Sequence, residues 1–412
     1  MEQQELIPHL FRSEYRKIVT VLGKLFGFDY IETAEDIASD TFLLAAETWG
    51  QKGIPANPVA WLYTVAKHKA LNHLKRDALF IKKITPAIKH LSREADPEIN
   101  ESGIDLSEKN IKDSQLQMMF AICHSAISVE AQVGLSLRLL CGFGIDEIAD
   151  AFLTSKDTIN KRLFRAKETL RTEKVTIELP GKQEINQRLE AVLTTLYLLF
   201  NEGYYSAAVN SILRKDLCLE AIRLNYLLVE NPSTDTPPAN ALLALMCFHA
   251  SRFEARTGQH GETILYDDQD ETLWNSELIE KGEYYLNRSA TGSRLSKYHL
   301  EAAIAYWHTH KQDTPEKWEQ ILQCYNQLLQ LQYSPVAALN RTYALAKANG
   351  IREGIAEAEK LQLTNNHFYF TLLGELYKSL DKEKAREYFL QALSLAKSQR
   401  DKDTIQSKIE RL

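Results

Sequence analysis

The chain has 412 residues, of which 44% are hydrophobic and 25% charged, a length that exceeds one ordinary core and a balance typical of a soluble globular protein. Its net charge of -6 argues against a protein that coats nucleic acid indiscriminately. The chain has no run of about 18 uncharged apolar residues, so no membrane span is expected. The N-terminus lacks a secretory signal and the five cysteines show no CxxC spacing, so we expect a cytoplasmic protein without disulfides, metal or cofactor.

Apolar residues recur at three- and four-residue spacing along nearly the whole chain, which predicts an all-α fold. Between Glu94 and Glu108 there are six acids and no Lys or Arg, so the surrounding stretch predicts a flexible linker. A further boundary is expected near Leu179-Pro180-Gly181 and a loop at Asn231–Pro238. We therefore predict a first domain at 1–90, a linker at 91–114, a second domain at 115–175 and a helical domain at 180–412.

Two local stretches are basic although the whole chain is acidic. Residues 61–90 hold seven Lys or Arg and one acid, and residues 156–174 hold seven and three acids. Charge concentrated in this way suits focused contacts with a polyanion if both stretches face the same way. Two solvated helix faces would carry the same pattern, so charge alone leaves both interpretations open.

The first predicted elements are two helices. Residues 34–49 form an amphipathic pattern, which by itself is most simply a surface helix. The next helix starts clearly, with Asn57 as N-cap and Pro58 at the first helical position. It sets basic side chains beside Trp61, a combination that suits a melted DNA strand whose phosphates need charge and whose bases need a surface. For Trp61 itself we favour a packing role over base stacking.

From Gly144 the sequence GIDEIADAFLTSKDTINKRLFRAKETLR predicts two helices joined by a short turn at Leu153-Thr154-Ser155. Ser155 can cap the second helix. A second helix that presents its N-terminal half suits the DNA major groove, although an ordinary helical hairpin with a charged outer face has the same pattern. The predicted core stripe is Ile159, Leu163, Ala166 and Leu170. The candidate DNA-contacting residues, which can read base edges or grip phosphate, are Lys156, Thr158, Asn160, Lys161, Arg162 and Arg165.

The second helix also carries a family resemblance. Its residues Ser155, Thr158, Ile159, Arg162, Leu163, Arg165 and Ala166 follow the order S-x-x-T-V-x-x-R-L-x-R-A. The segment therefore resembles region four of RNA polymerase sigma factors of the extracytoplasmic-function type. The resemblance implies that this domain binds the minus-thirty-five promoter element and contacts the β flap of the polymerase.

The first domain resembles region two of the same family. AEDIASDTFLLAAETW at 34–49 is similar to A-E-D-x-x-Q-x-x-F, with Ser39 in place of the usual Gln. The resemblance implies docking on the β′ clamp helices through Asp36, Asp40 and Phe42. The helix that starts at Pro58 contains, from Trp61, a string similar to W-L-x-x-I-A-R-N-x-x-x-D-x-x-R-R. In the family this helix and the loop before it recognise the minus-ten element, which here implicates Asn57, Lys67, His68, Asn72, Lys75 and Arg76. His68 and Asn72 replace the usual Asn and Asp.

The third domain resembles the C-terminal extension of a sigma subgroup that carries a tetratricopeptide-like domain. Strings such as LCLEAIRLNYLL from Leu217 and SPVAALNRTYALA from Ser334 carry the resemblance. Near the end, Leu373-Gly374, Tyr377, Ala385, Phe389 and Ala392 resemble the tetratricopeptide pattern, which predicts stacked helix pairs. Upstream, Asn201-Glu202-Gly203 predicts a helix end with a left-handed glycine.

The remaining candidate sites are weak. Asp267, Asp268, Asp270 and Glu271 lack calcium-loop spacing, so a solvated loop is favoured. His308 and His310 lack a third metal ligand, and no catalytic motif is present.

The leading prediction is a sigma factor, not an enzyme, that binds core RNA polymerase and promoter DNA. Its third domain would support or regulate this activity and could bind an unidentified partner. One alternative is a repressor or activator with a helical sensor domain. Residues 34–76 argue against it, because a repressor does not need a clamp-binding helix and a strand-melting helix. Another is a helical-repeat enzyme, against which the missing catalytic constellation counts.

Overall fold

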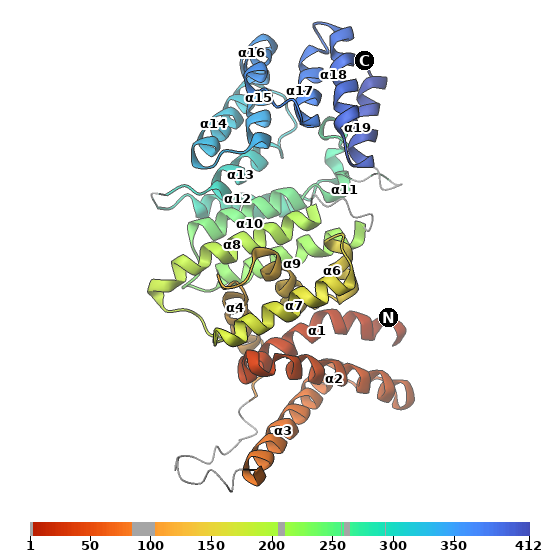
Figure 1. Ribbon diagram of the computed structural model, residues 1–412, viewed down its shortest axis with the longest axis vertical. Helices are drawn as coiled ribbons and strands as arrows, with labels where there is room; N and C mark the ends of the chain where they lie inside the picture. The colour runs from red at the N-terminus through yellow and green to blue at the C-terminus, as the bar shows by residue number, and fades with distance from the viewer. Residues whose placement is uncertain (1–2, 85–103, 205–210, 257, 259–263, 293) are drawn as a thin grey trace. The chain divides into compact units, whose positions relative to one another are not determined.

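The computed structural model describes residues 3–84, 104–204, 211–256, 258, 264–292 and 294–412. Within these ranges every regular element is a helix and none is a strand, so the predicted all-α fold is confirmed. The chain forms two compact units, Met1–Leu199 and Phe200–Leu412, and Figure 1 traces both from the N-terminus to the C-terminus. We call them unit 1 and unit 2.

Unit 1 is built around its first helix, which packs against α2, α3 and α4. Tyr15, Ile18 and Leu22 of that helix are completely buried. The helices of unit 1 are α1 (Gln3–Phe26), α2 (Ile31–Lys52), α3 (Pro58–Ile84), α4 (Glu108–Ile122), α5 (Val129–Leu135), α6 (Ile145–Ala151), α7 (Lys156–Thr172) and α8 (Lys182–Tyr204), whose last residues belong to unit 2. A π-helical turn, Ser136–Leu140, follows α5.

The predicted start of α3 is confirmed. The helix begins at Pro58, and the Asn57 side-chain oxygen accepts a hydrogen bond from the Ala60 amide at 3.0 Å. This bond satisfies one of the amides that a helix N-terminus leaves unpaired.

The region that we predicted as a linker is in part helical. Residues 85–103 lie outside the described residues, but α4 begins at Glu108. Ser107 caps this helix by accepting a hydrogen bond from the Asn110 amide, and Ile111 is buried. The cap and this one apolar anchor let a locally polar sequence become helical, because packing in the unit outweighs its composition.

The two helices predicted after Gly144 are present as α6 and α7. Residues 152–155 connect them, and Ser155 caps α7 by accepting a hydrogen bond from the Thr158 amide at 3.2 Å. Leu153, in the connection, adopts a left-handed conformation with φ of 49°. The predicted core stripe of α7 is confirmed, since all four of its residues are buried: Ile159, Leu163, Ala166 and Leu170.

Unit 2 contains shorter helices that mostly contact their neighbours in sequence. Their bounds are α9 (Ser211–Glu230), α10 (Pro237–Ala250), α11 (Phe253–Arg256), α12 (Ser276–Ser289), α13 (Lys297–Trp307), α14 (Pro315–Leu331), α15 (Pro335–Asn349), α16 (Ile351–Leu361), α17 (His367–Tyr377), α18 (Lys382–Leu395) and α19 (Gln399–Glu410). The predicted loop at 231–238 is present as the connection at 231–236, because Pro237 and Pro238 are already the first residues of α10.

Helix α10 forms the centre of the first half of unit 2. It is buried on nearly all sides and packs against α9, α12 and α13. Gly282 of α12 makes this packing close, because a Cβ atom there would lie 2.5 Å from the Phe248 ring. A helix that is apolar all round belongs in the interior of a protein.

The second half of unit 2, from α14 to α19, packs each helix against the next along the chain, as Figure 1 shows for α14 to α16. Gly374 allows α17 to approach α18, because a Cβ atom at this position would lie 2.6 Å from the buried Phe389 ring. Helix pairs of this kind bury their faces only by stacking on neighbours.

One local prediction in this part of the chain is wrong. Helix α8 runs through Asn201-Glu202-Gly203 to Tyr204, and Gly203 is not in the left-handed conformation. The apolar residues Leu199, Phe200 and Tyr204, which are all buried, continue the buried face beyond the polar residues. Packing of that face overrides the local stop signal.

Candidate nucleic-acid and polymerase surfaces

Helix α7 presents the predicted upstream-element residues on its outer side. Asn160, Lys161 and Arg165 are exposed, and Phe164 between them is 62% exposed. The buried stripe of the same helix holds this polar side outward, since side chains three and four residues apart share a face. The outer face can therefore offer an amide, an ammonium and a guanidinium group to one surface.

The other three predicted residues of α7 contact neighbouring residues of the same chain. Lys156 forms an ion pair with Asp146 at 2.8 Å, and its hydrogen bond to that carboxylate raises the pKa of Lys156. The Thr158 hydroxyl lies 2.8 Å from the Ser155 hydroxyl. The Arg162 guanidinium lies 5.4 Å from the centre of the Phe152 ring. These contacts steady the start of α7 and orient its side chains.

Helix α3 carries the predicted downstream-element residues. His68, Asn72, Lys75 and Arg76 are exposed and Lys67 is half-buried, while Asn57 is exposed and caps the helix. Trp61 packs edge to face on the buried Trp49, with 5.4 Å between ring centres, which supports the packing role that we favoured for it.

Helix α2 exposes Asp36 and Asp40 one turn apart. Asp40 lies 3.4 Å from the Lys69 ammonium of α3, and its side chain is 63% exposed. Phe42, by contrast, is 4% exposed and packs on the Phe11 ring with 5.0 Å between centres. It shares the buried stripe of α2 with Trp49, so in this conformation Phe42 is a core residue that supports the helix from within.

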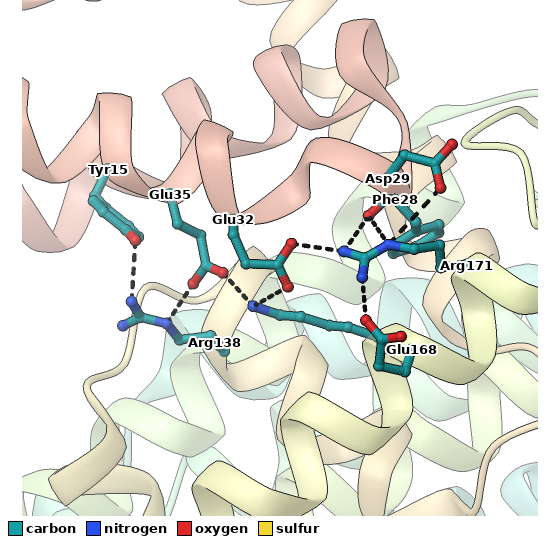
Figure 2. A network of polar contacts seen from close by, with 9 residues as sticks. Tyr15, Phe28, Asp29, Glu32, Glu35, Arg138, Glu168 and Arg171 are labelled. Carbon is teal, nitrogen blue, oxygen red and sulfur yellow. Dashed lines mark hydrogen bonds and ion pairs between the residues drawn. The ribbon is translucent and has the colours of Figure 1, made fainter.

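A buried ionic network joins α2 to the second half of unit 1 (Figure 2). Glu35 of α2 accepts a hydrogen bond from the Arg138 Nε at 2.7 Å and another from the Lys167 ammonium. Arg138 also donates to the Tyr15 hydroxyl at 3.2 Å. Burial raises the pKa of Tyr15 to about 12, although the Arg138 charge acts in the opposite direction. Glu35 thus connects α2 with α7 and the π-helical turn, and Arg138 extends the network to α1.

Arg171 makes a second connection near the end of α7 (Figure 2). It donates to the Phe28 carbonyl oxygen at 3.2 Å and pairs with Glu32 at 2.8 Å. Glu168 of α7 also contacts its guanidinium. Because these groups are partly exposed, the loss of one partner there should cost less stability than the loss of Glu35.

Sequence reasoning missed Glu35, Arg138, Lys167 and Arg171. The available signal was the position of Lys167, four residues after the core residue Leu163, where an ordinary solvated lysine is not expected. Its partner could not be named, because Glu35 lies 132 residues away in the chain.

Neither a metal centre nor a membrane span was found in the part of the chain that the structure describes. No group of three His, Cys, Asp or Glu residues in it is arranged to hold a metal ion. None of its helices combines the length and the apolar composition needed to cross a membrane.

Comparisons with known proteins agree with the N-terminal assignment. Residues 10–79 match the family model described as sigma-70 region 2, and residues 188–290 match a family of unknown function, DUF6596. The chain is 31% identical over 80 residues to the RNA polymerase sigma factor YlaC of Bacillus subtilis (strain 168), which covers 19% of this chain and 45% of that protein. No solved structure matches the chain significantly.

A full-length relative is also found. The chain is 30% identical over 390 residues to an uncharacterized protein of Rhizobium meliloti (strain 1021), and the match covers 93% of this chain and 91% of the relative. The two proteins therefore share both units. Region 2 implies core RNA polymerase and promoter DNA as partners and supports a role in transcription initiation. The chain therefore belongs to the same family as the Rhizobium meliloti protein, and it carries a sigma-70 region 2 domain at residues 10–79, which supports a role as an RNA polymerase sigma factor.

Proposed function

We propose that this chain is a promoter-specific sigma factor of the extracytoplasmic-function type that acts in the cytoplasm and uses both halves of unit 1. The observation that carries the proposal concerns the two helices matched by region 2. Helix α2 exposes the acids Asp36 and Asp40, and α3 exposes basic side chains. Asp36 and Asp40 would contact the polymerase β′ clamp helices, as the resemblance to region two implies. The basic face of α3 suits the melted minus-ten strand.

The second half of unit 1 is the proposed reader of the upstream element. Asn160, Lys161 and Arg165 are exposed on α7, and such side chains bind base edges and phosphates. Here α6 and α7 act as a helix-turn-helix, and the neighbouring surface would contact the β flap. The domain boundaries 1–90 and 115–175 belong to this proposal.

The decisive test is transcription with purified components. The full-length protein is combined with core RNA polymerase and fragments of its own genome, and the transcripts are sequenced. Transcripts that start at a shared two-element motif only when the chain is present support promoter-specific initiation. Co-elution with core polymerase without any specific start sites would contradict it, and a repressor would do neither.

Unit 2 is proposed to support or regulate unit 1 through a tetratricopeptide-like fold. The match with the Rhizobium meliloti protein extends over both units, which favours a required domain over a dispensable attachment. A truncation that tests this should end after Leu199, because the first turns of α8 belong to unit 1. Thr195 of α8 donates to the Gln132 side chain at 2.9 Å in the core of unit 1, so a cut after Lys174 would damage that core.

The truncated chain is compared with the full-length protein in the same transcription assay, with circular dichroism to verify folding. Loss of activity in a folded truncation supports a required domain, and a large gain supports an inhibitory one. Unchanged activity would rule out a regulatory role for unit 2.

A further inference from the structure

Three basic side chains of unit 2 gather in its interior. Arg252 is 7% exposed and Lys317 is 3% exposed, and Arg256 is half-buried one turn after Arg252. An arginine side chain stays protonated in proteins, so this part of unit 2 holds permanent positive charge. We call these three residues the basic cluster.

Aromatic rings lie against the charged groups of the basic cluster. The Arg252 guanidinium lies 5.4 Å from the centre of the Tyr266 ring and 5.9 Å from that of Trp274. The Arg256 guanidinium lies 3.8 Å from the centre of the Tyr204 ring. Ring faces attract cations, but more weakly than a counter-charge does.

No described carboxylate lies within ion-pair distance of either guanidinium, and nearby acids are engaged elsewhere. Asp268 pairs with Arg411, Asp270 accepts hydrogen bonds from Thr272, and Asp313 pairs with Lys347. Asp313 and Asp267 still act electrostatically on Lys317. Among the described residues the two arginines are thus buried or half-buried charges without a counter-ion, which is costly in an isolated protein.

Several polar atoms around the basic cluster also lack a hydrogen-bond partner among the described residues. Arg252 Nε is one of them, and the side chain of Gln269, which is 4% exposed, leaves its Oε1 without a donor. Trp274 Nε1 and His249 Nδ1 are buried and unpaired as well. Native proteins seldom leave so many buried polar atoms unsatisfied in one place, and each such group calls for an explanation such as a bound molecule.

The pKa values of two buried histidines, His249 and His308, show that the electrostatic potential here is positive. Burial lowers the pKa of His249 well below its usual range, and Arg252 and Arg256 lower it further. Burial, followed by Arg252 and Lys317, lowers the pKa of His308 to about 3. Both imidazoles are therefore neutral at pH 7 and add no positive charge, while the potential at this place favours an anion.

We propose that the basic cluster binds a small multivalent oxyanion, the phosphate or carboxylate groups of a small molecule. Guanidinium groups grip the oxygens of phosphate and carboxylate in pairs, and Lys317 contributes a third positive charge. Tyr204, Tyr266 and Trp274 would contact the body of the ligand. The proposal does not rest on the sigma-factor role, because it concerns only the interior of unit 2.

The test uses the full-length protein with inorganic phosphate and with citrate as probes. Thermal unfolding and isothermal titration calorimetry are measured in each, against sodium chloride at equal ionic strength. The expected result is saturable binding of at least one probe with a Kd of about 1 mM or tighter. Binding of phosphate alone identifies a phosphate ligand, and binding of citrate alone identifies a polycarboxylate.

Variants separate a site from a general salt effect. Arg252→Gln and Arg256→Gln should each weaken binding about tenfold or more, since a charged hydrogen bond is lost. Arg352→Gln, at an exposed arginine of α16, should bind as the wild type does. If Arg252→Gln does not fold, the binding measured with Arg256→Gln tests the proposal. Absence of saturable binding, or equal responses in all variants, would overturn the proposal, because salts such as phosphate stabilise many proteins without a site.

Discussion

Glu35 of α2 lies 2.7 Å from Arg138, 103 residues further along the chain, and a second oxygen of the same carboxylate meets Lys167 of α7. The Glu35 side chain is 9% exposed and that of Lys167 is 11% exposed. The carboxylate therefore compensates two cations from the second half of unit 1, and its removal would leave Arg138 without a carboxylate and Lys167 with Glu32 alone.

The first prediction concerns this carboxylate. Glu35→Gln should lower the free energy of unfolding by about 3 kcal/mol, because it leaves Arg138 without its carboxylate and Lys167 with only the more distant Glu32, 3.8 Å away. Urea unfolding followed by circular dichroism measures the change. Glu47→Gln, an exposed acid on the same helix, should change it by less than about 0.5 kcal/mol. Equal stability of the two variants would show that the network contributes little.

The second prediction concerns promoter contacts. Lys161→Ala or Arg165→Ala should weaken binding to a cognate upstream element by about 1–3 kcal/mol if a base edge is read. Binding to variant promoter fragments is measured by fluorescence anisotropy at fixed salt. A uniform loss across all sequences would instead indicate phosphate contact, and Lys182→Ala, exposed at the start of α8, serves as the control. Normal affinity in both α7 variants would refute the upstream assignment.

The third prediction concerns the polymerase. The double substitution Asp36→Arg/Asp40→Arg should abolish co-elution with core RNA polymerase, because it reverses the charge of one exposed face of α2. The fold should survive, since the Asp40 ion pair with Lys69 is exposed. Glu383→Arg/Glu387→Arg has the same four-residue spacing on exposed positions of α18 and should co-elute normally. A complex of normal affinity with the α2 variant would mean that region 2 binds polymerase through another surface.

The fourth prediction concerns pH. The pKa of His308 is lowered from 6.5 to about 3 in the folded state, so the unfolded chain binds a proton at this residue first as the pH falls. The contribution of His308 to the free energy of unfolding is therefore fully present above pH 6.5 and is lost as the pH falls from 6.5 to 3. His308→Gln should reduce that slope, measured as the free energy of unfolding against pH, whereas His68→Gln, on the exposed side of α3, should leave it unchanged. Identical slopes would contradict the burial of His308 as a neutral group.

The fifth prediction concerns helix packing in unit 2. Gly374→Ala places a methyl group 2.6 Å from the buried Phe389 ring and should destabilise the protein by about 1–3 kcal/mol. Adding Phe389→Leu removes the clash, so the double variant should lose less than the sum of the two single losses. Strict additivity in this double-mutant cycle would show that the two residues are not in contact.

The amino-acid sequence by itself determined the helices and many of their ends. The start of α3 at Asn57-Pro58, the cap of α7 at Ser155 and the buried stripe of α7 follow from local patterns of capping and three- to four-residue spacing. The resemblance to region two rests on the same local strings, and the exposure of Asp36 and Lys161 follows from which side of each helix is apolar.

Tertiary structure decided everything that joins residues far apart. The partners of Glu35 are 103 and 132 residues away, and nothing in the local pattern selects them. Phe42 had the right spacing for a polymerase contact, yet packing on Phe11 places it in the core. Arg252 and Lys317 look like surface residues in the sequence. Only the folding of distant helices around Tyr266 encloses their charges, because burial and electrostatic compensation depend on which groups meet in space.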